Sequence, residues 1–532
     1  MMLREVKLLE KISVRNYRTF PSETTFEIAP ITILLGINSS GKSSITRLLP
    51  LFAQSLTNRS AGPILWVTDN LDYGSFLDNV HNNNASGQIE FKLEGRGATI
   101  FQNILSRSMD LYGQSLSGEF KYSICVGQGS DVTSISSLDI EFYGERVQFI
   151  ARTPGGLFSS IKLNGEDYSG ILKGRDGVIG RGFFPEMFFV RFKDGAATIA
   201  PTAELLDQAV SLLGKYAHAN ASKSKLRGLI TPVPFLSLSA TIQLISNRAA
   251  AIPSLKRNLE KISKREWREI WLTLFICNYS SIIESIKEAV EPDITQGGYL
   301  GPVRARASRY YRRQELAVDQ IDSTGDNLAM YLNSLSVFEL NQINTDLAEF
   351  FGHKIIVDPG QGHISLRIGA KDAEHTDNLA DVGFGFTQLL PVIAQVHAVR
   401  RWALSTSRRT RTRATKSPIF AVEQPELHLH PAYQAKLGAY LVHAARNEAG
   451  SIEPQLRFLI ETHSEQLVNA IASAVAAGEI AAEDVKIYLF ERTPDSDGTE
   501  VISADIRPNG EIPNWPYGFF TSGRLHPPVS LG

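Results

Sequence analysis

The chain has 532 residues, more than one hydrophobic core usually organises, so two or three lobes are expected. Its 54 basic and 56 acidic side chains leave a formal charge of −2, which excludes a histone-like protein and confines any nucleic-acid surface to a local patch. A content of 43% hydrophobic and 21% charged residues is that of a globular protein and excludes extensive disorder.

Cysteine usage and the first residues bear on the compartment. Only Cys125 and Cys277 are present, outside any metal-ligand or disulfide-framework spacing, which fits a reducing cytoplasm. The first 20 residues mix charges into every apolar stretch, so no signal peptide is expected. The longest apolar runs fall short of the roughly 20 residues that cross a bilayer. We therefore expect a cytoplasmic protein that does not bind membranes.

Residues 1–180 are predicted to form a β-rich lobe, because short runs of alternating apolar residues follow one another between Gly, Asn and Asp. One early helix is expected from Lys42 to about Leu56, directly after an apolar strand from Ile31 to Leu35. Strand, loop and helix together make one unit.

Residues 181–299 are predicted to be an inserted helical arm, since helical periodicity dominates from Thr202 to Val290 and is broken by a Pro-containing stretch. Residues 300–532 are predicted to form a second α/β lobe, whose strands lie near 354–357, 419–422, 458–460 and 485–490. The expected class is therefore α/β.

The loop after the predicted strand from Ile31 to Leu35 gives the strongest evidence for a binding site. The residues from Gly36 to Ser43 read Gly-Ile-Asn-Ser-Ser-Gly-Lys-Ser, the phosphate-loop pattern in its proper strand–helix context. Backbone N–H groups of such a loop surround the β-phosphate of a nucleotide, Lys42 neutralises its β/γ oxygens, and the Ser43 hydroxyl coordinates magnesium. The predicted nucleotide-binding residues here are Asn38, Ser39, Ser40, Gly41, Lys42, Ser43 and Ser44.

Two later strands end in polar clusters. Residues 418–422 lead into Glu423-Gln-Pro-Glu426, where Glu423 is placed to face a nucleotide-bound metal together with Ser43. The apolar stretch at 457–460 leads into Glu-Thr-His463. Carboxyl ends of parallel strands meet at one edge of a sheet, so these clusters and the phosphate loop are expected to form a single site.

The order of these motifs resembles the ABC-type ATPases of the RecF, Rad50 and structural-maintenance class. The opening ISVRNYRTF is similar to that class's first strand, and DVGFGFTQLL at 381–390 stands in the place of its signature motif. EQPELHLHP and ETHSE resemble the Walker B, D-loop and switch-histidine segments of the AAA15/AAA21 branch, which includes overcoming-lysogenisation-defect ATPases. Together with EIPNWPYGFF near the end, the combination is similar to the PtuA-type ATPases of the Septu and retron defence systems.

The resemblance implies an ABC-type P-loop ATPase head that uses ATP and Mg²⁺, with Gly383 and Gly385 contacting nucleotide across a homodimer or higher homo-oligomer. Two positions depart from its pattern. Gly383 replaces the usual signature Ser, so contacts there must come from backbone N–H groups. Gln424 replaces the glutamate that activates water, and an amide cannot accept a proton as a carboxylate does. Two alternatives remain: Gln424 positions water while Glu426 or His463 assists a slow hydrolysis, or ATP chiefly drives assembly.

Two basic clusters are candidates for nucleic-acid contact. Residues 400–416 are expected to be an exposed loop, which either binds phosphates with release of counterions or is simply solvated. The second cluster interleaves arginines with two tyrosines that could stack on bases, although it could equally pack on the nucleotide lobe. It comprises Arg304, Arg306, Arg309, Tyr310, Tyr311, Arg312 and Arg313.

The resulting functional hypothesis is a regulatory ATPase of an anti-phage complex that controls a separate nuclease or toxin effector, with an HNH nuclease as one candidate. The alternative is a RecF-like repair ATPase that binds duplex DNA by itself. A stand-alone metabolic kinase is disfavoured, because a signature-like segment is present without an acceptor pocket. About 40 residues follow the strand at 485–490, too few for a fused Toprim nuclease, and Asp495 and Asp497 are expected in a hairpin turn.

Overall fold

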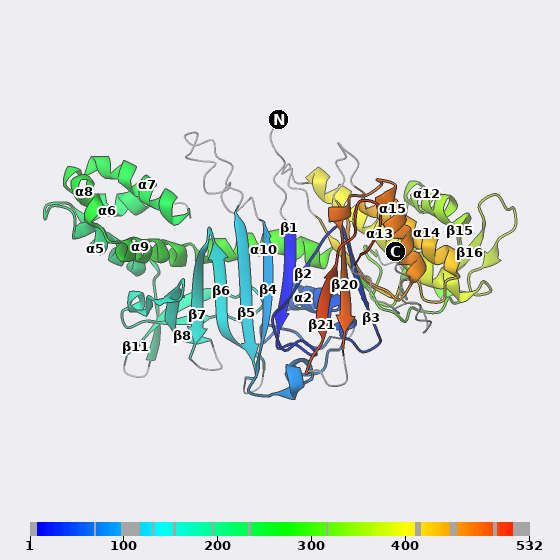
Figure 1. Ribbon diagram of the computed structural model, residues 1–532, viewed down its shortest axis with the longest axis horizontal. Coiled ribbons are helices and arrows are strands. Elements are labelled where there is room, and N and C mark those ends of the chain that lie inside the picture. Colours follow the sequence, from blue (N-terminus) through cyan, green and yellow to red (C-terminus); the bar gives the residue numbers. More distant parts are fainter. Residues whose placement is uncertain are drawn as a thin grey trace, which may run out of the picture. The chain divides into compact units, whose positions relative to one another are not determined.

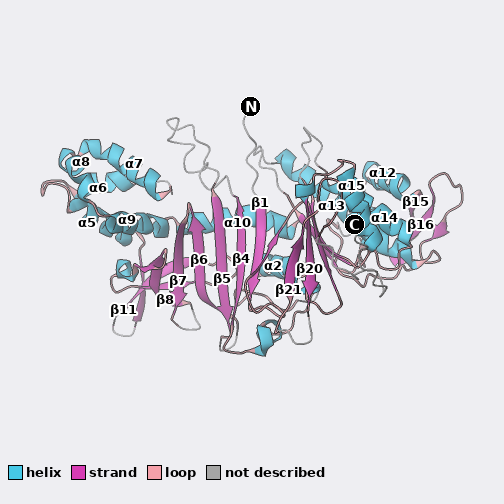
Figure 2. Ribbon diagram, in the orientation of Figure 1, coloured by secondary structure: helices cyan, strands magenta, loops and turns pink. Residues whose placement is uncertain are grey.

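The computed structural model describes residues 8–68, 71–96, 118–129, 132–152, 156–193, 196–231, 236–314, 318–409, 417–446, 455–492 and 497–513. The chain forms two compact units, Met1–Phe26 with Leu51–Glu291, and Glu27–Pro50 with Pro292–Gly532. Helices and strands are mixed in both, so the α/β class expected from the sequence is confirmed (Figure 2). The three-part division at residues 180 and 299 remains a prediction.

The first unit is built on an 11-stranded sheet whose strands run in the order β12-β11-β10-β8-β7-β6-β5-β4-β1-β2, with β9 beside β8. Neighbouring strands from β1 to β8 lie side by side in Figure 1. The strands are β1 (Leu8–Arg15), β2 (Thr24–Glu27), β4 (Gln88–Arg96), β5 (Glu119–Gly127), β6 (Ser134–Phe142), β7 (Glu145–Ala151), β8 (Leu157–Leu163), β9 (Glu166–Asp167), β10 (Asp176–Ile179), β11 (Met187–Lys193) and β12 (Ala196–Ala200).

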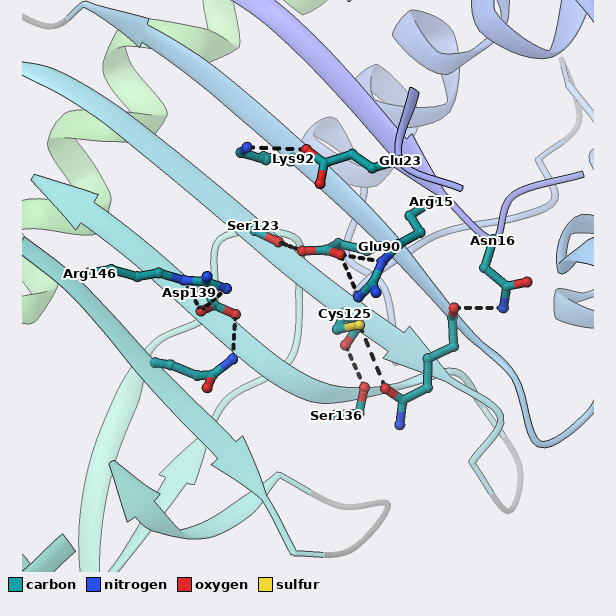
Figure 3. A network of polar contacts seen from close by, with 12 residues as sticks. Arg15, Asn16, Glu23, Glu90, Lys92, Ser123, Cys125, Ser136, Asp139 and Arg146 are labelled. Carbon is teal, nitrogen blue, oxygen red and sulfur yellow. Dashed lines mark hydrogen bonds and ion pairs between the residues drawn. The ribbon is translucent and has the colours of Figure 1, made fainter. Parts of the chain in front are cut away.

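One face of this sheet is apolar and the opposite face is polar, because successive side chains of a strand alternate. In β4, Phe91 and Leu93 are fully buried. On the other face, Glu90 accepts hydrogen bonds from Arg15 Nε (2.8 Å) and Ser123 Oγ (2.6 Å), as Figure 3 shows. Cross-strand partners of this kind satisfy the polar face of the sheet and stabilise its register.

Most helices of the first unit lie within the segment from Thr202 to Val290 that the sequence predicts to be helical, and β11 and β12 precede it at 187–200. Phe149 of β7 packs on Phe275 and Tyr279, with ring centroids 6.4 and 6.0 Å apart. The helices are α2 (Leu48–Thr57), α3 (Phe76–Asn79), α5 (Ala203–Gly214), α6 (Lys223–Ile230), α7 (Leu238–Arg248), α8 (Pro253–Asn258), α9 (Lys264–Cys277) and α10 (Tyr279–Thr295).

The second unit contains a six-stranded sheet in the order β13-β18-β19-β3-β20-β21, parallel except for the last strand. The strands are β13 (Tyr299–Leu300), β18 (Ile419–Glu423), β19 (Arg457–Glu461), β3 (Ile31–Gly36), β20 (Val485–Glu491) and β21 (Glu500–Ala504). Every residue of β3, β18 and β19 is buried, as expected of parallel strands covered on both faces. The predicted strands at 31–35, 419–422, 458–460 and 485–490 are confirmed, and so is the final hairpin; Asp495 lies outside the described residues.

Six helices of the second unit are described: α1 (Lys42–Thr46), α11 (Leu328–Ser334), α12 (Val337–Asp346), α13 (Phe384–Arg409), α14 (Pro431–Ala445) and α15 (Glu465–Ala476). A small antiparallel sheet joins β14 (Tyr311–Arg312), β16 (His363–Ala370) and β15 (His353–Pro359), with β17 (Asp377–Asn378) beside β16. The predicted helix from Lys42 is interrupted at Arg47, where the backbone (φ −80°, ψ −3°) leaves α1 before α2 begins. No helix in the described ranges is long and apolar enough to cross a bilayer.

The basic segment at 400–416 is not the exposed loop that the sequence predicted, as far as it is described. Residues 400–409 are the last turns of α13, and 410–416 lie outside the described residues. Arg400 pairs with Asp346 at 3.8 Å and Arg401 pairs with Glu339 at 3.0 Å. The apolar face of α13 packs in the core through Val399, and Ala403, one turn further, is also buried, which favours a helix here.

A buried ion pair joins the end of α10 to β19. The guanidinium of Arg457 donates to Asp293 Oδ2 at 2.7 Å, and the two side chains are 2% and 1% exposed. The same guanidinium donates to the carbonyl oxygens of Ser417 and Ile28. Because both side chains are buried, each charge depends on its partner.

Asp293→Ala should therefore lower the free energy of unfolding by roughly 3–5 kcal/mol, since it removes the carboxylate that pairs with the buried Arg457 guanidinium. Urea titration followed by circular dichroism measures the loss. The control is Glu511→Ala, which breaks an ion pair with Arg507 whose side chains are 62% and 59% exposed and should lower the free energy of unfolding far less. Equal losses in the two variants would contradict this account.

Candidate nucleotide-binding site

The predicted phosphate loop connects the end of β3 to the start of α1. Gly41 has a left-handed backbone (φ 99°), which other residues rarely adopt. At Gly36 a Cβ atom would lie 2.7 Å from the carbonyl oxygen of Phe490 and 2.7 Å from Ser40 Oγ, so only glycine fits. Both glycines are thus required by the backbone path. The loop has the geometry in which N–H groups can approach a phosphate closely.

Lys42 is folded into this loop. Its Nζ donates to the carbonyl oxygens of Gly36 at 2.9 Å and Ile37 at 2.8 Å. Burial lowers the pKa of the Lys42 amine, and the nearby Glu461 carboxylate opposes that shift. Ser40 Oγ is buried, with no hydrogen-bond partner in the described part of the chain. A buried ammonium and an unsatisfied hydroxyl in one loop fit a bound phosphate group.

Two glutamates end neighbouring parallel strands beside the loop. Glu423 of β18 and Glu461 of β19 are register partners, and Glu461 is also the partner of Leu34 on β3. Ser43 Oγ donates to Glu461 Oε1 at 2.9 Å, and Thr46 Oγ1 lies 3.4 Å from Glu461 Oε2. Burial and the Glu423 charge raise the pKa of Glu461 to about 7. The predicted magnesium ligand Ser43 therefore contacts Glu461.

Glu423, the predicted metal residue, is engaged elsewhere. Arg47 Nε donates to its Oε1 at 2.6 Å and Arg47 Nη2 to its Oε2 at 2.9 Å. The Tyr299 hydroxyl also donates to Oε1, at 2.7 Å. The hydrogen bond to Glu423 raises the pKa of the Arg47 guanidinium. A bidentate pair of this kind is among the strongest charge-assisted contacts in proteins.

The three predicted catalytic residues surround the same strand ends. Gln424 has a left-handed backbone (φ 43°) and its N–H donates to the Glu461 carbonyl oxygen at 2.7 Å. Glu426 accepts the His463 backbone N–H at 2.7 Å. Burial is the main cause that raises the pKa of Glu426 and lowers that of His463. Glu426 Oε2 and His463 Nε2 are buried without a hydrogen-bond partner among the described residues, so both remain available to a ligand or water.

The signature-like glycines lie at the start of α13, which begins at Phe384. A Cβ atom on Gly383 would meet nothing within 4 Å, whereas one on Gly385 would lie 3.3 Å from the Leu429 side chain. In the described part of the chain, no hydrogen bond, ion pair or ring contact links Gly383 or Gly385 to the loop at 36–43. Described hydrogen bonds therefore join the loop to the two strand ends, and none of them joins the loop to these glycines.

Sequence reasoning missed four residues of the site: Arg47, Tyr299, Arg304 and Glu461. For Glu461 a signal was present, because two apolar strands, IFAVE and RFLIE, end in the same residue type. Arg304 was assigned to a candidate DNA-binding cluster, yet it is only 4% exposed and donates to the Glu423 carbonyl oxygen at 2.8 Å. That burial excludes Arg304 from nucleic-acid contact.

The rest of the cluster is on or near the surface. Tyr310 is 60% exposed, and Arg309 forms an ion pair with Asp381. Contact of this surface with nucleic acid stays a prediction. Among the residues that the structure describes, no group of three or more His, Cys, Asp or Glu side chains is arranged to hold a metal ion.

Two family models match the chain. One, described as AAA ATPase domain, matches residues 8–111 and 246–468, more than half of the chain. The other, described as protein of unknown function (DUF3696), matches residues 480–521. The first match includes the phosphate loop and both glutamate-ended strands. A comparison with curated proteins gave no match.

Solved structures that the chain matches at low similarity include SMC head domains. The Smc head domain with an extended coiled coil, bound to the C-terminal domain of ScpA and derived from Pyrococcus furiosus, is 11% identical (TM-score 0.33; 93% of this chain and 96% of that chain covered). The SMC head domain from Thermotoga maritima is 8% identical (TM-score 0.32; 94% and 99% covered).

Lys42→Ala should weaken ATP binding by about 100-fold or more, because it removes the cation available to the phosphates while the loop backbone stays in place. Isothermal titration calorimetry measures the affinity, and circular dichroism checks the fold. Lys256→Ala, an exposed lysine of α8, is the matched control and should bind like the parent. An unchanged affinity in folded Lys42→Ala would refute the phosphate-loop assignment.

Proposed function

The chain belongs to the AAA ATPase domain family, and we propose that it binds ATP with Mg²⁺ and hydrolyses it slowly, as the nucleotide-dependent switch of a larger complex. One observation carries the proposal: the phosphate loop, with Lys42 buried inside it, meets the buried ends of β18 and β19 at a single sheet edge. Lys42 would contact the β/γ-phosphates, and Ser43 with the neighbouring carboxylates would hold the metal ion. Bound Mg²⁺ would neutralise charge on the phosphates.

We expect hydrolysis to be slow because of the side chains that would surround the attacking water. Gln424 can orient a water molecule through its amide but cannot take a proton from it. Glu426 and His463 present buried atoms without partners among the described residues, and burial lowers the pKa of His463, which favours the neutral imidazole. Neutral imidazole can donate one hydrogen bond and accept another. These groups support positioning of water and of the γ-phosphate, with weak general-base catalysis.

Gln424→Glu should raise steady-state ATP hydrolysis by about 10-fold or more, because a positioned general base contributes roughly 10²–10⁴-fold to such reactions. The measurement is phosphate release at saturating ATP and magnesium. Gln361→Glu, an exposed glutamine between β15 and β16, gives a matched amide-to-acid control whose rate should stay at the parental level. A rate of Gln424→Glu that stays flat or falls would place Gln424 away from the attacking water.

We also propose that ATP promotes self-association, because in the class that this chain resembles the signature loop completes the site of a second copy. The start of α13 supports this role: Gly383 has open space where a side chain would begin, and Phe384 is 50% exposed. Gly383 and Gly385 would then contact the partner's nucleotide through the backbone.

Gly383→Asp should abolish ATP-dependent association and leave ATP affinity of the monomer within about 2-fold, since the added carboxylate would face phosphate charge only in the assembled form. Light scattering with and without ATP measures the mass. Gly385→Asp should act in the same direction but with local repacking, because Leu429 is close. ATP-dependent association that equals the parent's in Gly383→Asp would contradict the sandwich arrangement.

The finer biological role rests on the resemblance to PtuA-type ATPases. We propose that the chain controls a separate nuclease or toxin effector in an anti-phage complex, and that nucleotide occupancy shifts the assembly between states that restrain and release it. An HNH nuclease is one candidate for that effector. The RecF-like alternative differs in needing duplex DNA and no second polypeptide.

Incubation of the purified chain with plasmid DNA, ATP and Mg²⁺ or Mn²⁺ should leave the plasmid intact. Addition of the separate effector polypeptide should give cleavage, and the Lys42→Ala change in this chain should alter the extent of that cleavage. Agarose gel electrophoresis measures both results. Cleavage by the purified chain that survives Lys42→Ala would place a nuclease in the chain itself. Tight binding of duplex DNA without a partner would favour the repair alternative.

A further inference from the structure

Two buried glutamates, Glu423 and Glu461, lie where we propose that the metal ion binds, and their surroundings differ. β19 lies between β3 and β18 in the sheet, so Glu461 is one strand closer to the phosphate loop than Glu423. Parallel strands are about 4.8 Å apart, which is close to the length of a glutamate side chain. The sheet order alone therefore gives Glu461 the shorter reach to α1.

The contacts follow this difference in position. Ser43 and Thr46 lie three residues apart on α1, so they share one helix face, and that face is turned to Glu461. Ser43 Oγ donates to Glu461 Oε1 at 2.9 Å, while Thr46 Oγ1 is 3.4 Å from Oε2. The second distance is long for a hydroxyl–carboxylate bond, so this oxygen is the more weakly held of the two.

Glu423 is constrained by a stronger set of partners. Both of its oxygens accept from Arg47, and Oε1 accepts from Tyr299 as well. The Glu423 side chain is 2% exposed, so loss of the arginine would leave a buried negative charge. A carboxylate already neutralised by a guanidinium also offers less charge to a cation than one held by hydroxyl groups.

From these contacts we propose that Glu461 is the metal-positioning residue of this site, acting through the Ser43 hydroxyl, and that the ion pair with Arg47 keeps Glu423 in a supporting role. The inference rests on the proposed function, since it concerns the metal ion that accompanies ATP. Glu461 also accepts the Gln424 N–H through its own carbonyl oxygen at 2.7 Å. Glu461 thus contacts both Ser43, the proposed metal ligand, and Gln424, which is proposed to orient water.

The test compares Glu461→Gln with Glu423→Gln, which remove the same charge from neighbouring strands. Mn²⁺ serves as the probe, and electron paramagnetic resonance measures its affinity in the presence of saturating ADP. Glu461→Gln should weaken Mn²⁺ binding by about 10- to 100-fold, the usual cost of losing a residue that orients a metal ligand. Glu423→Gln should have the smaller effect, and Glu461→Asp should recover part of the loss.

Nucleotide binding without metal separates this role from a structural one. In EDTA, a fluorescent ATP analogue should bind Glu461→Gln within about 2-fold of the parent, because the loop backbone and the Lys42 ammonium, which are proposed to bind the phosphates, are retained. Glu483→Gln, an exposed glutamate of the same unit, should match the parent in both assays. Circular dichroism checks that each variant is folded.

A double-mutant cycle tests action through Ser43. If Glu461 positions the metal through that hydroxyl, Ser43→Ala combined with Glu461→Gln should bind Mn²⁺ no more weakly than Ser43→Ala alone. Additive losses would overturn the route through Ser43. Parental Mn²⁺ affinity in folded Glu461→Gln, a larger loss in Glu423→Gln, or equal losses of nucleotide with and without metal would overturn the role of Glu461. Failure of the parent chain to bind nucleotide at all would instead refute the proposed function.

Discussion

The arrangement of the site depends on the position of β19 between β3 and β18. Parallel strands in register bring their carboxyl ends to one edge, so the phosphate loop after β3 and the polar residues after the other two strands must meet there. Because all residues of these three strands are buried, a shift in register would place charged ends in the core. Packing of the sheet therefore determines which side chains reach Ser43.

Charge balance explains how this edge tolerates two buried glutamates. Arg47 and Tyr299 hold Glu423, while Ser43, Thr46 and the field of Lys42 act on Glu461. Burial raises the pKa of Glu461, and repulsion by the Glu423 carboxylate on the neighbouring strand raises it further. An incoming cation would relieve that repulsion. This electrostatic arrangement fits the metal ion that we propose for the site.

A strained backbone conformation and buried polar atoms without a described partner occur together at this edge of the sheet. Gln424 holds a left-handed conformation that non-glycine residues seldom adopt, and it is fixed by the N–H bond to Glu461. Beside it, Glu426 Oε2 and His463 Nε2 are buried without a described partner. Such features lower the stability of the folded chain. They are consistent with a site whose remaining contacts are made by a ligand, by water or by another polypeptide.

Local sequence determined much of this protein: the glycine pattern at 36–43 needs a loop between a strand and a helix, and the apolar runs at 419–422, 458–460 and 485–490 form the predicted strands. Only the tertiary structure decided which residues these strands bring together. Arg304 looked like part of a basic surface, but long-range packing buries it under Glu423. Arg47, Tyr299 and Glu461 are separated by up to 414 positions along the chain, and no local pattern records strand order, which decides their contacts.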